Sequence, residues 1–400
     1  MNILFLSIAG LADINDPGIF TDLLRQFRDG GAHVYAASAR QKRLGLRTEY
    51  TVEEGINMLR VQIGNVTKTG LIEKGISTLR IESQYIKAIR EYLSDVKFDL
   101  VIYTTPPITF DKVIKYIKKS TGAKSYLLLK DIFPQNAIDL NMINKKGPVY
   151  WYFRRKEKNL YGNSDYIGCM SQANVDFILK NNPEINPDIV EVCPNSIEPV
   201  TLEKDQEEIR SIRKKYNIPL DRTVFIYGGN LGKPQGIDFL IECLRSNKEN
   251  EDVYFIIAGS GTEFNKLKSW FDMELPGNAQ LFAQLPKSDY ELLANSCDAG
   301  LIFLDRRFTI PNFPSRMLSY MQASMPVLAA TDVNTDLGKV IEKGRFGFWC
   351  ESGKLEDFNE LVRKLCDEEL GRELGANARK YLVENYTSKH SYEIIMNHFK

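Results

Sequence analysis

The chain has 400 residues, of which 43% are hydrophobic, and its 52 Lys and Arg residues are balanced by 52 Asp and Glu residues. This length exceeds one ordinary hydrophobic core, so we expect two domains of around 150 to 200 residues each. The formal net charge of +0 excludes a protein that holds duplex nucleic acid through a bulk basic field.

The first ten residues, MNILFLSIAG, lack a basic leader followed by a long apolar stretch, and no run of about 18 apolar residues occurs in the chain. We therefore expect a cytoplasmic protein. The cysteines lie far apart, with no C-x-x-C pair and no nearby His, so we expect buried, reduced thiols and no zinc site. They are Cys169, Cys193, Cys243, Cys297, Cys350 and Cys366.

Apolar runs of strand length alternate with helical patterns in the first half of the chain. The expected strands read NILFLS, HVYAAS, DLVIYTT, KSYLLL and DYIGCMS, and a further strand ends near Val192. Helical segments are expected from Gly18 to Asp29 and from Ile76 to Leu93. Near-continuous apolar strands between helices predict a parallel sheet covered on both faces.

A basic aromatic segment, KKGPVYWYFRRKEKNLYGNSDY, lies within this half. Such a helix can rest on an anionic membrane surface, which would place the protein at the inner face of the plasma membrane. The alternative is an amphipathic helix with Trp151, Tyr152 and Leu160 in the core and its charges in water. The sequence leaves both interpretations open. The cations of the segment are Lys145, Lys146, Arg154, Arg155, Lys156 and Lys158.

A polar, proline-punctuated segment, PNSIEPVTLEKDQEEIRS, has no strand pattern and is predicted to link two domains. The strand pattern then returns as TVFIYGG, VYFIIAGSG, AQLFAQL, AGLIFL and PVLAAT, with helical spacing between the runs. We place the domains at residues 1–196 and 197–385, with a helix at 386–400 that packs back on the first. In such sheets the ligand lies beyond the carboxyl ends of the strands, so we expect the site in a cleft between two doubly wound, Rossmann-like domains.

One glycine-rich turn, FIYGGNLGKPQG at residues 225–236, follows a strand and opens a helix. The backbone N–H groups of Gly229 to Gly232 and the helix N-terminus would form an anion site, most naturally for phosphate. The turn is neither G-x-G-x-x-G nor a Walker loop, and a glycine turn between strand and helix can be mere geometry. Lys233 adds a mobile cation.

A second stretch, IPNFPSRMLSYMQASMPVLAAT, predicts a helix that begins at Pro314 and Ser315 and leads into a buried strand. It would bring another helix N-terminus and Arg316 to the same strand ends, where two helix termini could share a diphosphate. The alternative is that Ser315 is an ordinary N-cap and Arg316 a surface charge.

The order of several segments resembles the glycosyltransferases of family 4, which have the GT-B fold. The resemblance covers nearly the whole chain and is nearest to bacterial members that build capsular or O-antigen polysaccharides. The segments are GIFTDLLRQFRDGGAHV, KDIFPQNA, VCPNSIEP, YGGNLGKPQGIDFLIECL, FIIAGSGTEFNKLK, FAQLPKSDYELLANSCDAGLIFL, FPSRMLSYMQASMPVLA and ANARKYLVENYTSKHSYEIIMNHF.

The resemblance implies a nucleotide-sugar donor, with UDP as the expected nucleotide, and assigns residues to it. A glycine loop ending in Gly18 would lie near the donor phosphates, and the turn with Gly229, Asn230 and Lys233 would take the diphosphate. The segments that border the nucleotide include Gly259, Gly261 and Leu285. The remaining donor-side assignments are Asn195, Gln235, Pro314, Ser315, Arg316 and Ser319.

The chain departs from the family pattern at charged positions. Two glutamates that the family commonly carries are replaced by Pro311 and Ser319, and the usual arginine and lysine of the turn are Asn230 and Gln235. Losing those cations removes charge-assisted phosphate contacts of about 1.5 to 3 kcal/mol each. Lys233 and Arg316 are the nearest candidates to compensate, with Arg306 or Arg307 in reserve, and our hypothesis is that Lys233 replaces the missing pair. The glycine usual before the last strand is Ser324.

Family 4 enzymes usually retain the anomeric configuration, and in the usual proposal the leaving phosphate accepts the proton of the acceptor hydroxyl. Stabilisation of the leaving diphosphate would then be the main catalytic contribution. If a carboxylate acts, we choose Asp131, which ends a buried strand where related enzymes also have an aspartate. The alternative is that Asp131 only hydrogen-bonds the following loop. We expect no metal and no cofactor other than the donor substrate.

Three functions are compatible with the sequence. The leading one is a retaining glycosyltransferase that extends a cell-surface polysaccharide on a polyprenyl-diphosphate-linked or oligosaccharide acceptor. The second is a catalytically silent GT-B subunit that scaffolds another transferase, which the missing glutamates support. The third is a sugar-nucleotide epimerase, which would need acid and base groups that are scarce here.

Overall fold

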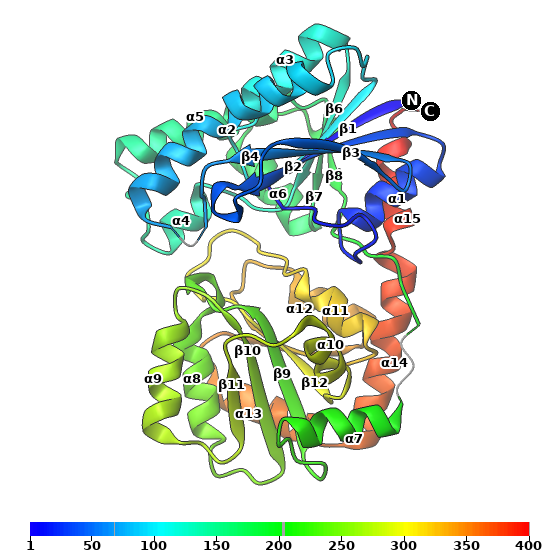
Figure 1. Cartoon of the computed structure of the whole chain (residues 1–400). Helices are drawn as coiled ribbons and strands as arrows, with labels where there is room; N and C mark the ends of the chain where they lie inside the picture. Colours follow the sequence, from blue (N-terminus) through cyan, green and yellow to red (C-terminus); the bar gives the residue numbers. More distant parts are fainter. Residues whose placement is uncertain (68, 202–204, 400) are drawn as a thin grey trace. The chain divides into compact units, whose positions relative to one another are not determined.

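The computed structural model describes residues 1–67, 69–201 and 205–399. The chain divides into two compact units, drawn in Figure 1: unit 1 is Met1–Glu198 with Thr387–Lys400, and unit 2 is Pro199–Tyr386. Residues 202–204, which the sequence placed in the linker, lie outside the described residues. The rest of the predicted linker is not all loop, because a helix begins at Gln206, where the Asp205 side chain accepts the N–H of Glu207 at 2.8 Å.

Unit 1 is built on one sheet with the strand order β3-β4-β2-β1-β5-β6-β7-β8. All neighbouring strands are parallel except β3 and β4, which pair antiparallel at one edge. The strand predictions for this half are confirmed, while β3 and β4 were not predicted. The strands are β1 (Asn2–Leu6), β2 (His33–Gln41), β3 (Glu49–Glu53), β4 (Ile56–Ile63), β5 (Leu100–Thr104), β6 (Lys124–Leu129), β7 (Tyr166–Cys169) and β8 (Val190–Val192).

Helices cover both faces of this sheet. The first predicted helix starts at Thr21 rather than Gly18, and the second starts at Leu71, ahead of the expected Ile76. The α-helices are α1 (Thr21–Asp29), α2 (Leu71–Tyr92), α3 (Asp111–Thr121), α4 (Gln135–Asp139), α5 (Pro148–Asn163), α6 (Gln172–Asn181) and α15 (Ser388–Met396). Short 3-10 helices are η1 (Lys42–Leu44) and η2 (Pro187–Ile189).

The last helix belongs to unit 1, as the sequence predicted. In Figure 1, α15 lies beside α1, and the rings of Tyr392 and Phe27 meet edge to face with centroids 5.2 Å apart. The buried Ile395 joins Phe27 and residues of β1, β2, β5 and β6 in one hydrophobic core. A cap formed by Thr387, whose Oγ1 accepts the N–H of His390 at 3.1 Å, fixes the start of this helix.

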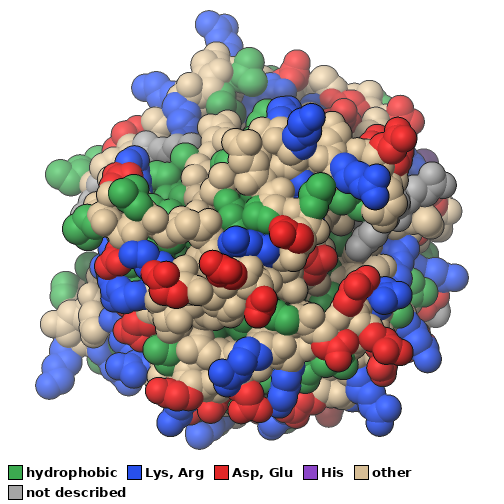
Figure 2. All heavy atoms as spheres, turned by 90° about the horizontal axis from the view of Figure 1, so that it is seen from below, with side chains coloured by type: hydrophobic (Ala, Val, Ile, Leu, Met, Phe, Trp, Pro, Cys, Tyr) green, Lys and Arg blue, Asp and Glu red, His purple; other side chains and the backbone are tan. Residues whose placement is uncertain are grey.

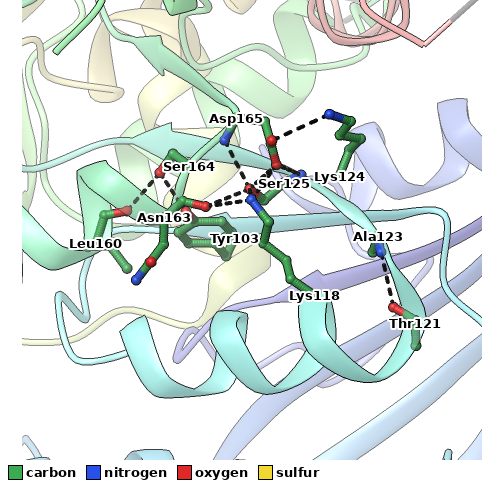
Figure 3. Close-up of polar contacts among 10 residues, drawn as sticks. All are labelled: Tyr103, Lys118, Thr121, Ala123, Lys124, Ser125, Leu160, Asn163, Ser164 and Asp165. Atoms are coloured by element: carbon green, nitrogen blue, oxygen red, sulfur yellow. Dashed lines mark hydrogen bonds and ion pairs between the residues drawn. The ribbon is translucent and has the colours of Figure 1, made fainter.

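A polar network at the amino ends of β6 and β7 holds these two strands in register (Figure 3). The Asp165 carboxylate accepts Lys118 Nζ at 2.6 Å, the Ser125 hydroxyl at 2.8 Å and the Ser125 N–H at 2.9 Å. Burial acts to raise the pKa of Asp165, but the hydrogen bonds from Lys118 and Ser125 outweigh it and lower the pKa. Because ligands of parallel sheets bind at the carboxyl ends of the strands, we assign this network to stability.

The basic aromatic segment forms α5, and the structure corrects individual residues in each of the two interpretations. Lys156, counted among the membrane-facing cations, is buried and pairs with Asp111 at 2.7 Å and Glu82 at 3.0 Å. Trp151 and Tyr152, assigned to the core in the alternative, are 63% and 41% exposed. Only the burial of Leu160 in that alternative is confirmed. The helix sets its ion-pairing face inward and leaves aromatic rings in water.

Unit 2 has a second, fully parallel sheet with the strand order β11-β10-β9-β12-β13-β14. Its predicted strands are confirmed, and the edge strand β14 is an addition. The strands are β9 (Thr223–Asn230), β10 (Val253–Ser260), β11 (Ala279–Phe282), β12 (Ala299–Phe303), β13 (Val327–Thr331) and β14 (Gly347–Glu351).

The core of unit 2 joins β9, β10 and β12 to the helices α8, α9 and α13, as the apolar spacing of the sequence indicated. The helices are α7 (Gln206–Lys215), α8 (Ile237–Ser246), α9 (Phe264–Glu274), α10 (Lys287–Asn295), α11 (Arg316–Gln322), α12 (Leu337–Gly344), α13 (Leu355–Leu365) and α14 (Glu368–Asn385). A 3-10 turn, η3 (Lys233–Gln235), precedes α8.

Charge and hydropathy follow the sequence-based expectations in part. The cysteines are unpaired thiols, all buried except Cys366, which is half-buried. Figure 2 shows cationic and anionic side chains interspersed on the face it draws, as expected for a chain with 52 residues of each sign. Among the described residues, no helix is both long and apolar enough to cross a membrane.

Candidate functional site

The site candidates of unit 2 gather where the turn after β9 meets the start of α11. A Cβ atom placed on Gly229 would lie 2.6 Å from Nη2 of Arg316, so the guanidinium occupies the space that a side chain would fill. Gly229 has a φ of 127°, which also favours glycine. The sequence predicted these two segments near one another, and the structure brings them into contact.

The turn itself is closed by side chains at the two positions that lack the usual cations. Asn230 Nδ2 donates to Gln235 Oε1 at 3.1 Å, and the same oxygen accepts the N–H of Gly232 at 3.1 Å. The N–H of Leu231 donates to the carbonyl of Ser260 at 2.9 Å. Two of the amides expected to hold a diphosphate are therefore already bonded within the protein. The expectation that the turn binds phosphate mostly through its backbone is wrong for these two.

Close packing explains the glycines at the end of β10, Gly259 within the strand and Gly261 just after it. A Cβ on Gly259 would lie 1.8 Å from the carbonyl oxygen of Gly229, and a Cβ on Gly261 would lie 2.3 Å from the backbone of Leu231. Both distances are far below van der Waals contact, so a larger residue would push the turn after β9 out of place. Gly259 and Gly261 thus shape the candidate site through the adjacent turn.

Arg316 is placed by aromatic rings. Its guanidinium carbon lies 4.0 Å from the ring centroid of Tyr227, which is a cation–π geometry. The groups that act on its charge are the tyrosines Tyr227, Tyr320 and Tyr290, and in the part of the chain that the structure describes no carboxylate pairs with it. These three tyrosines were missed at the sequence level, where only the YGG and LSY strings contained a hint of two of them.

The other donor-side candidates of unit 2 are exposed or half-buried. Lys233 in η3 and Ser319 on α11 are exposed, and Leu285 lies half-buried in the loop between β11 and α10. The predicted helix start is confirmed to within one residue: Pro314 precedes Ser315, which is the N-cap of α11 but makes no side-chain capping bond. The helix has only 7 residues, so its contribution rests on the Arg316 side chain rather than on a dipole.

The reserve cations lie in a separate pocket. Arg307 forms an ion pair with Asp305, with Nη2 2.7 Å from Oδ2, so its charge is already balanced within the protein. Arg306 is exposed and faces Gly353. Both line a pocket of about 290 Å³ with Gly236 and Asp238, beside the start of α8.

The last departure from the family pattern, Ser324, places a residue other than glycine in a strained backbone conformation. Ser324 adopts a φ of 52°, a left-handed conformation that glycine takes without strain. The residue stands in the turn between α11 and β13, so the glycine expected there would serve the turn geometry.

In unit 1, Asp131 follows β6 at its carboxyl end, as expected. Its Oδ1 accepts the Asn136 side-chain amide at 2.7 Å, and its N–H donates to Thr105 Oγ1 at 3.1 Å. Burial raises the pKa of Asp131 to about 6, while the bond from Asn136 acts in the opposite direction. Such a carboxyl group can accept or release a proton near neutral pH. Asn136 was missed as its partner, although it stands in the same KDIFPQNA segment.

Gly18 and Asn195 lie elsewhere in unit 1. The N–H of Gly18 donates to Asp22 Oδ1 at 3.1 Å, at the entry to α1. Asn195 is 8% exposed and lines a cavity of about 10 Å³ with Lys130, whose pKa burial lowers to about 8. The cavity has room for about one water molecule, which is too little for a phosphate.

Comparison with known proteins supplies the family context. A model described as Glycosyl transferases group 1 matches residues 208–381. The chain is 22% identical over 328 residues to the "Probable glycosyltransferase WbjE" of Pseudomonas aeruginosa, covering 82% of this chain and 80% of that protein.

Solved structures share the fold over the whole chain. Anabaena Alr3699/HepE in complex with UDP and glucose superposes with a TM-score of 0.71 at 17% identity, covering 100% of this chain and 99% of that one. WaaG, a glycosyltransferase involved in lipopolysaccharide biosynthesis, superposes with a TM-score of 0.68 at 14% identity, covering 98% and 99%. The chain therefore has the GT-B fold, and its residues 208–381 match the family model Glycosyl transferases group 1.

Proposed function

We propose that this protein transfers a sugar from a UDP-linked donor to a lipid-linked or oligosaccharide acceptor in the synthesis of a cell-surface polysaccharide. The group 1 domain and the relative WbjE support glycosyl transfer. The structural neighbour HepE binds UDP and glucose, which supports a UDP-sugar, and WaaG, named for lipopolysaccharide biosynthesis, supports a surface glycan. Unit 2, which carries the group 1 domain, binds the donor, and unit 1 binds the acceptor.

The observation that carries this proposal is the position of Arg316. Its guanidinium lies against Gly229 at the carboxyl edge of β9, where a parallel sheet of this kind receives its ligand. A cation without a carboxylate partner in the described chain can bind a diphosphate through charge-assisted hydrogen bonds. The exposed Lys233 supplies a second, mobile charge.

The reaction retains the anomeric configuration and releases the nucleoside diphosphate as the leaving group. Arg316 stabilises the negative charge that develops on this leaving group, which is the main electrostatic contribution. Asp131 accepts the proton of the acceptor hydroxyl, since burial has brought its pKa to about 6. No residue in this scheme requires a metal ion.

The nucleotide is tested by thermal unfolding with UDP, GDP and uridine, followed by assays of nucleotide-sugar hydrolysis without acceptor. A ligand at 100 times its Kd stabilises the folded state by about 2.7 kcal/mol, which raises the Tm of a domain this size by several degrees. We expect UDP to produce this shift, uridine to produce little, and a UDP-sugar to be hydrolysed slowly. Absence of any shift with UDP and GDP would refute the donor assignment.

A second candidate, a silent subunit that scaffolds another transferase, is favoured by one observation. Ser319 stands exposed on α11 where the family usually has a glutamate for the ribose. The same hydrolysis assay separates the two functions. UDP binding without any hydrolysis or transfer would support the scaffold.

The acceptor end of the proposal rests on an exposed apolar and basic surface of unit 1, the start of α5. Val149 and Trp151 are 51% and 63% exposed, and Lys145, Lys146 and Arg155 are exposed beside them in sequence. Aromatic and aliphatic side chains near lysines suit the headgroup region of an anionic bilayer. This surface would bring unit 1 to a polyprenyl-diphosphate-linked acceptor.

Liposome flotation tests the membrane contact. The protein should float with vesicles containing anionic lipid at low salt and remain in solution with neutral vesicles or at high salt. Trp151→Ser combined with Lys145→Glu should abolish flotation, while Met273→Ser, which removes a 76% exposed side chain of unit 2, should not. Equal flotation of these two variants would argue against the start of α5 as the contact.

A further inference from the structure

The Tyr227 ring stacks against the Arg316 guanidinium. The ring is fully buried at 0% exposure in the core of unit 2, and the guanidinium carbon lies 4.0 Å from its centroid. The hydroxyl of Tyr227 donates to the carbonyl of Asn230 at 2.7 Å, at the end of the same strand. One side chain therefore contacts both the cation of α11 and the glycine turn that follows β9.

The helix that carries Arg316 is itself anchored one turn further on. The Tyr320 hydroxyl is 3.1 Å from the carbonyl of Leu301 on β12 and 3.2 Å from the carbonyl of Ile226 on β9. A Cβ on Gly300 would lie 2.3 Å from the Tyr320 ring, so the glycine makes room for this anchor. The backbone of Arg316 is thus fixed relative to the two strands that flank the candidate site.

A ring and a carboxylate would hold this arginine with opposite consequences. A carboxylate would occupy the in-plane N–H donors of the guanidinium and neutralise its charge. An aromatic ring attracts the cation through its face and leaves the N–H groups at the edge free for phosphate oxygens. Because tyrosines rather than carboxylates surround Arg316, the arginine keeps its charge, and one of its hydrogen bonds goes to the Tyr227 side chain.

The two altered positions of the turn supply no cation. Asn230 and Gln235 stand where the resemblance led us to expect an arginine and a lysine, and they bond to one another at 3.1 Å. Lys233 is exposed, and an exposed, unfixed lysine contributes little because ordering it costs side-chain entropy. Arg316 is an oriented cation that contacts the turn, with Nη2 lying 2.6 Å from the position of a Cβ on Gly229.

We propose that Tyr227 is a positioning residue, which stacks on Arg316 and holds its guanidinium ready for the diphosphate of the donor. The inference deepens the proposed function and rests on it for the identity of the ligand. Tyr227 does not touch the ligand in this scheme. Its ring orders the long Arg316 side chain before the ligand binds, which reduces the entropy lost on binding. Loss of the ring therefore lowers affinity for the diphosphate even though the arginine remains.

The test is a double-mutant cycle on UDP affinity in the full chain. Tyr227→Leu removes the ring, and we expect the Kd for UDP to rise about tenfold, whereas Tyr227→Phe keeps the ring and should stay within about twofold of wild type. In an Arg316→Met background, Tyr227→Leu should have no further effect, because the two residues act through one interaction. Phe225→Leu is the matched control, since Phe225 is equally buried on the same strand.

A ligand-free measurement separates failure of this inference from failure of the proposed function. The NMR signal of the Arg316 Nε–Hε group, assigned with Arg316→Met, should carry a ring-current shift that disappears in Tyr227→Leu and persists in Tyr227→Phe. If wild type binds neither UDP nor GDP, the ligand assignment falls together with the role of Tyr227 in binding it. If wild type binds UDP and either Tyr227→Leu binds equally well or Phe225→Leu weakens binding as much, Tyr227 has no positioning role.

Discussion

Replacement of Arg316 by methionine should weaken UDP binding by about 10- to 150-fold, since a charge-assisted hydrogen-bonded contact is worth about 1.5 to 3 kcal/mol. Methionine keeps much of the apolar stem that packs near Tyr227 and removes the charge and the N–H donors. Isothermal titration with UDP measures the effect. Turnover of the UDP-sugar should fall at least as far, because the leaving diphosphate gains negative charge in the transition state.

Two further substitutions make this result specific. Lys233→Ala should weaken UDP binding less than about fivefold, because the side chain is exposed and unfixed. Arg372→Met removes an arginine that is 74% exposed on α14 and should leave UDP affinity unchanged. If Lys233→Ala is the more damaging of the two candidate-site variants, the mobile lysine replaces the missing pair, as the sequence first led us to expect.

Replacement of Asp131 by asparagine should lower kcat/KM by about 10²- to 10⁴-fold, the range typical of a lost general base, while UDP affinity stays near wild type. In the wild-type protein, kcat/KM should fall as the pH drops below about 6, because burial raises the pKa of Asp131 to about 6 and a protonated carboxyl cannot accept a proton. This acidic limb should vanish in Asp131→Asn. Steady-state kinetics between pH 5 and about 8 measure both effects.

The partner of Asp131 offers a finer check on the same assignment. Asn136 donates to Asp131 Oδ1 at 2.7 Å, and this bond lowers the pKa of the carboxyl group. Asn136→Ala should therefore move the acidic limb to higher pH. Asp188→Asn, at an exposed position of η2, is the control and should change neither limb nor rate. Full activity of Asp131→Asn would leave proton transfer to the departing phosphate and reduce Asp131 to a loop-bonding role.

The apolar pattern of the sequence predicted every strand except β3, β4 and β14, because buried parallel strands are near-continuous apolar runs. The interior strand β4 was missed because Asn57, Arg60 and Gln62 interrupt its apolar run, and the edge strands were missed for a different reason. At the edge, β3 has a mixed, half-exposed composition, and β14 begins at Gly347, so neither carries the buried-strand signal. Helix α7 was missed because it lies within the predicted linker, where the Asp205 side chain caps its start.

Side-chain roles on α5 could not be derived from the segment alone. Its lysines look alike in sequence, yet Lys156 is buried because Glu82 and Asp111, distant along the chain, meet it from α2 and α3. Trp151 is exposed although a large aromatic side chain suits a hydrophobic core. Which face of an amphipathic helix is covered depends on the neighbours that pack against it.

What the sequence by itself determined is the order of apolar runs and glycine turns, and with them the GT-B fold and the segments near the ends of the strands. The tertiary structure decided how the turn after β9 is held: Gln235 bonds the amide of Gly232, and Tyr227 supports Arg316 from a different element. The physical reason is that hydrogen-bond partners and cation–π contacts depend on distances between segments remote in sequence, which local patterns do not encode.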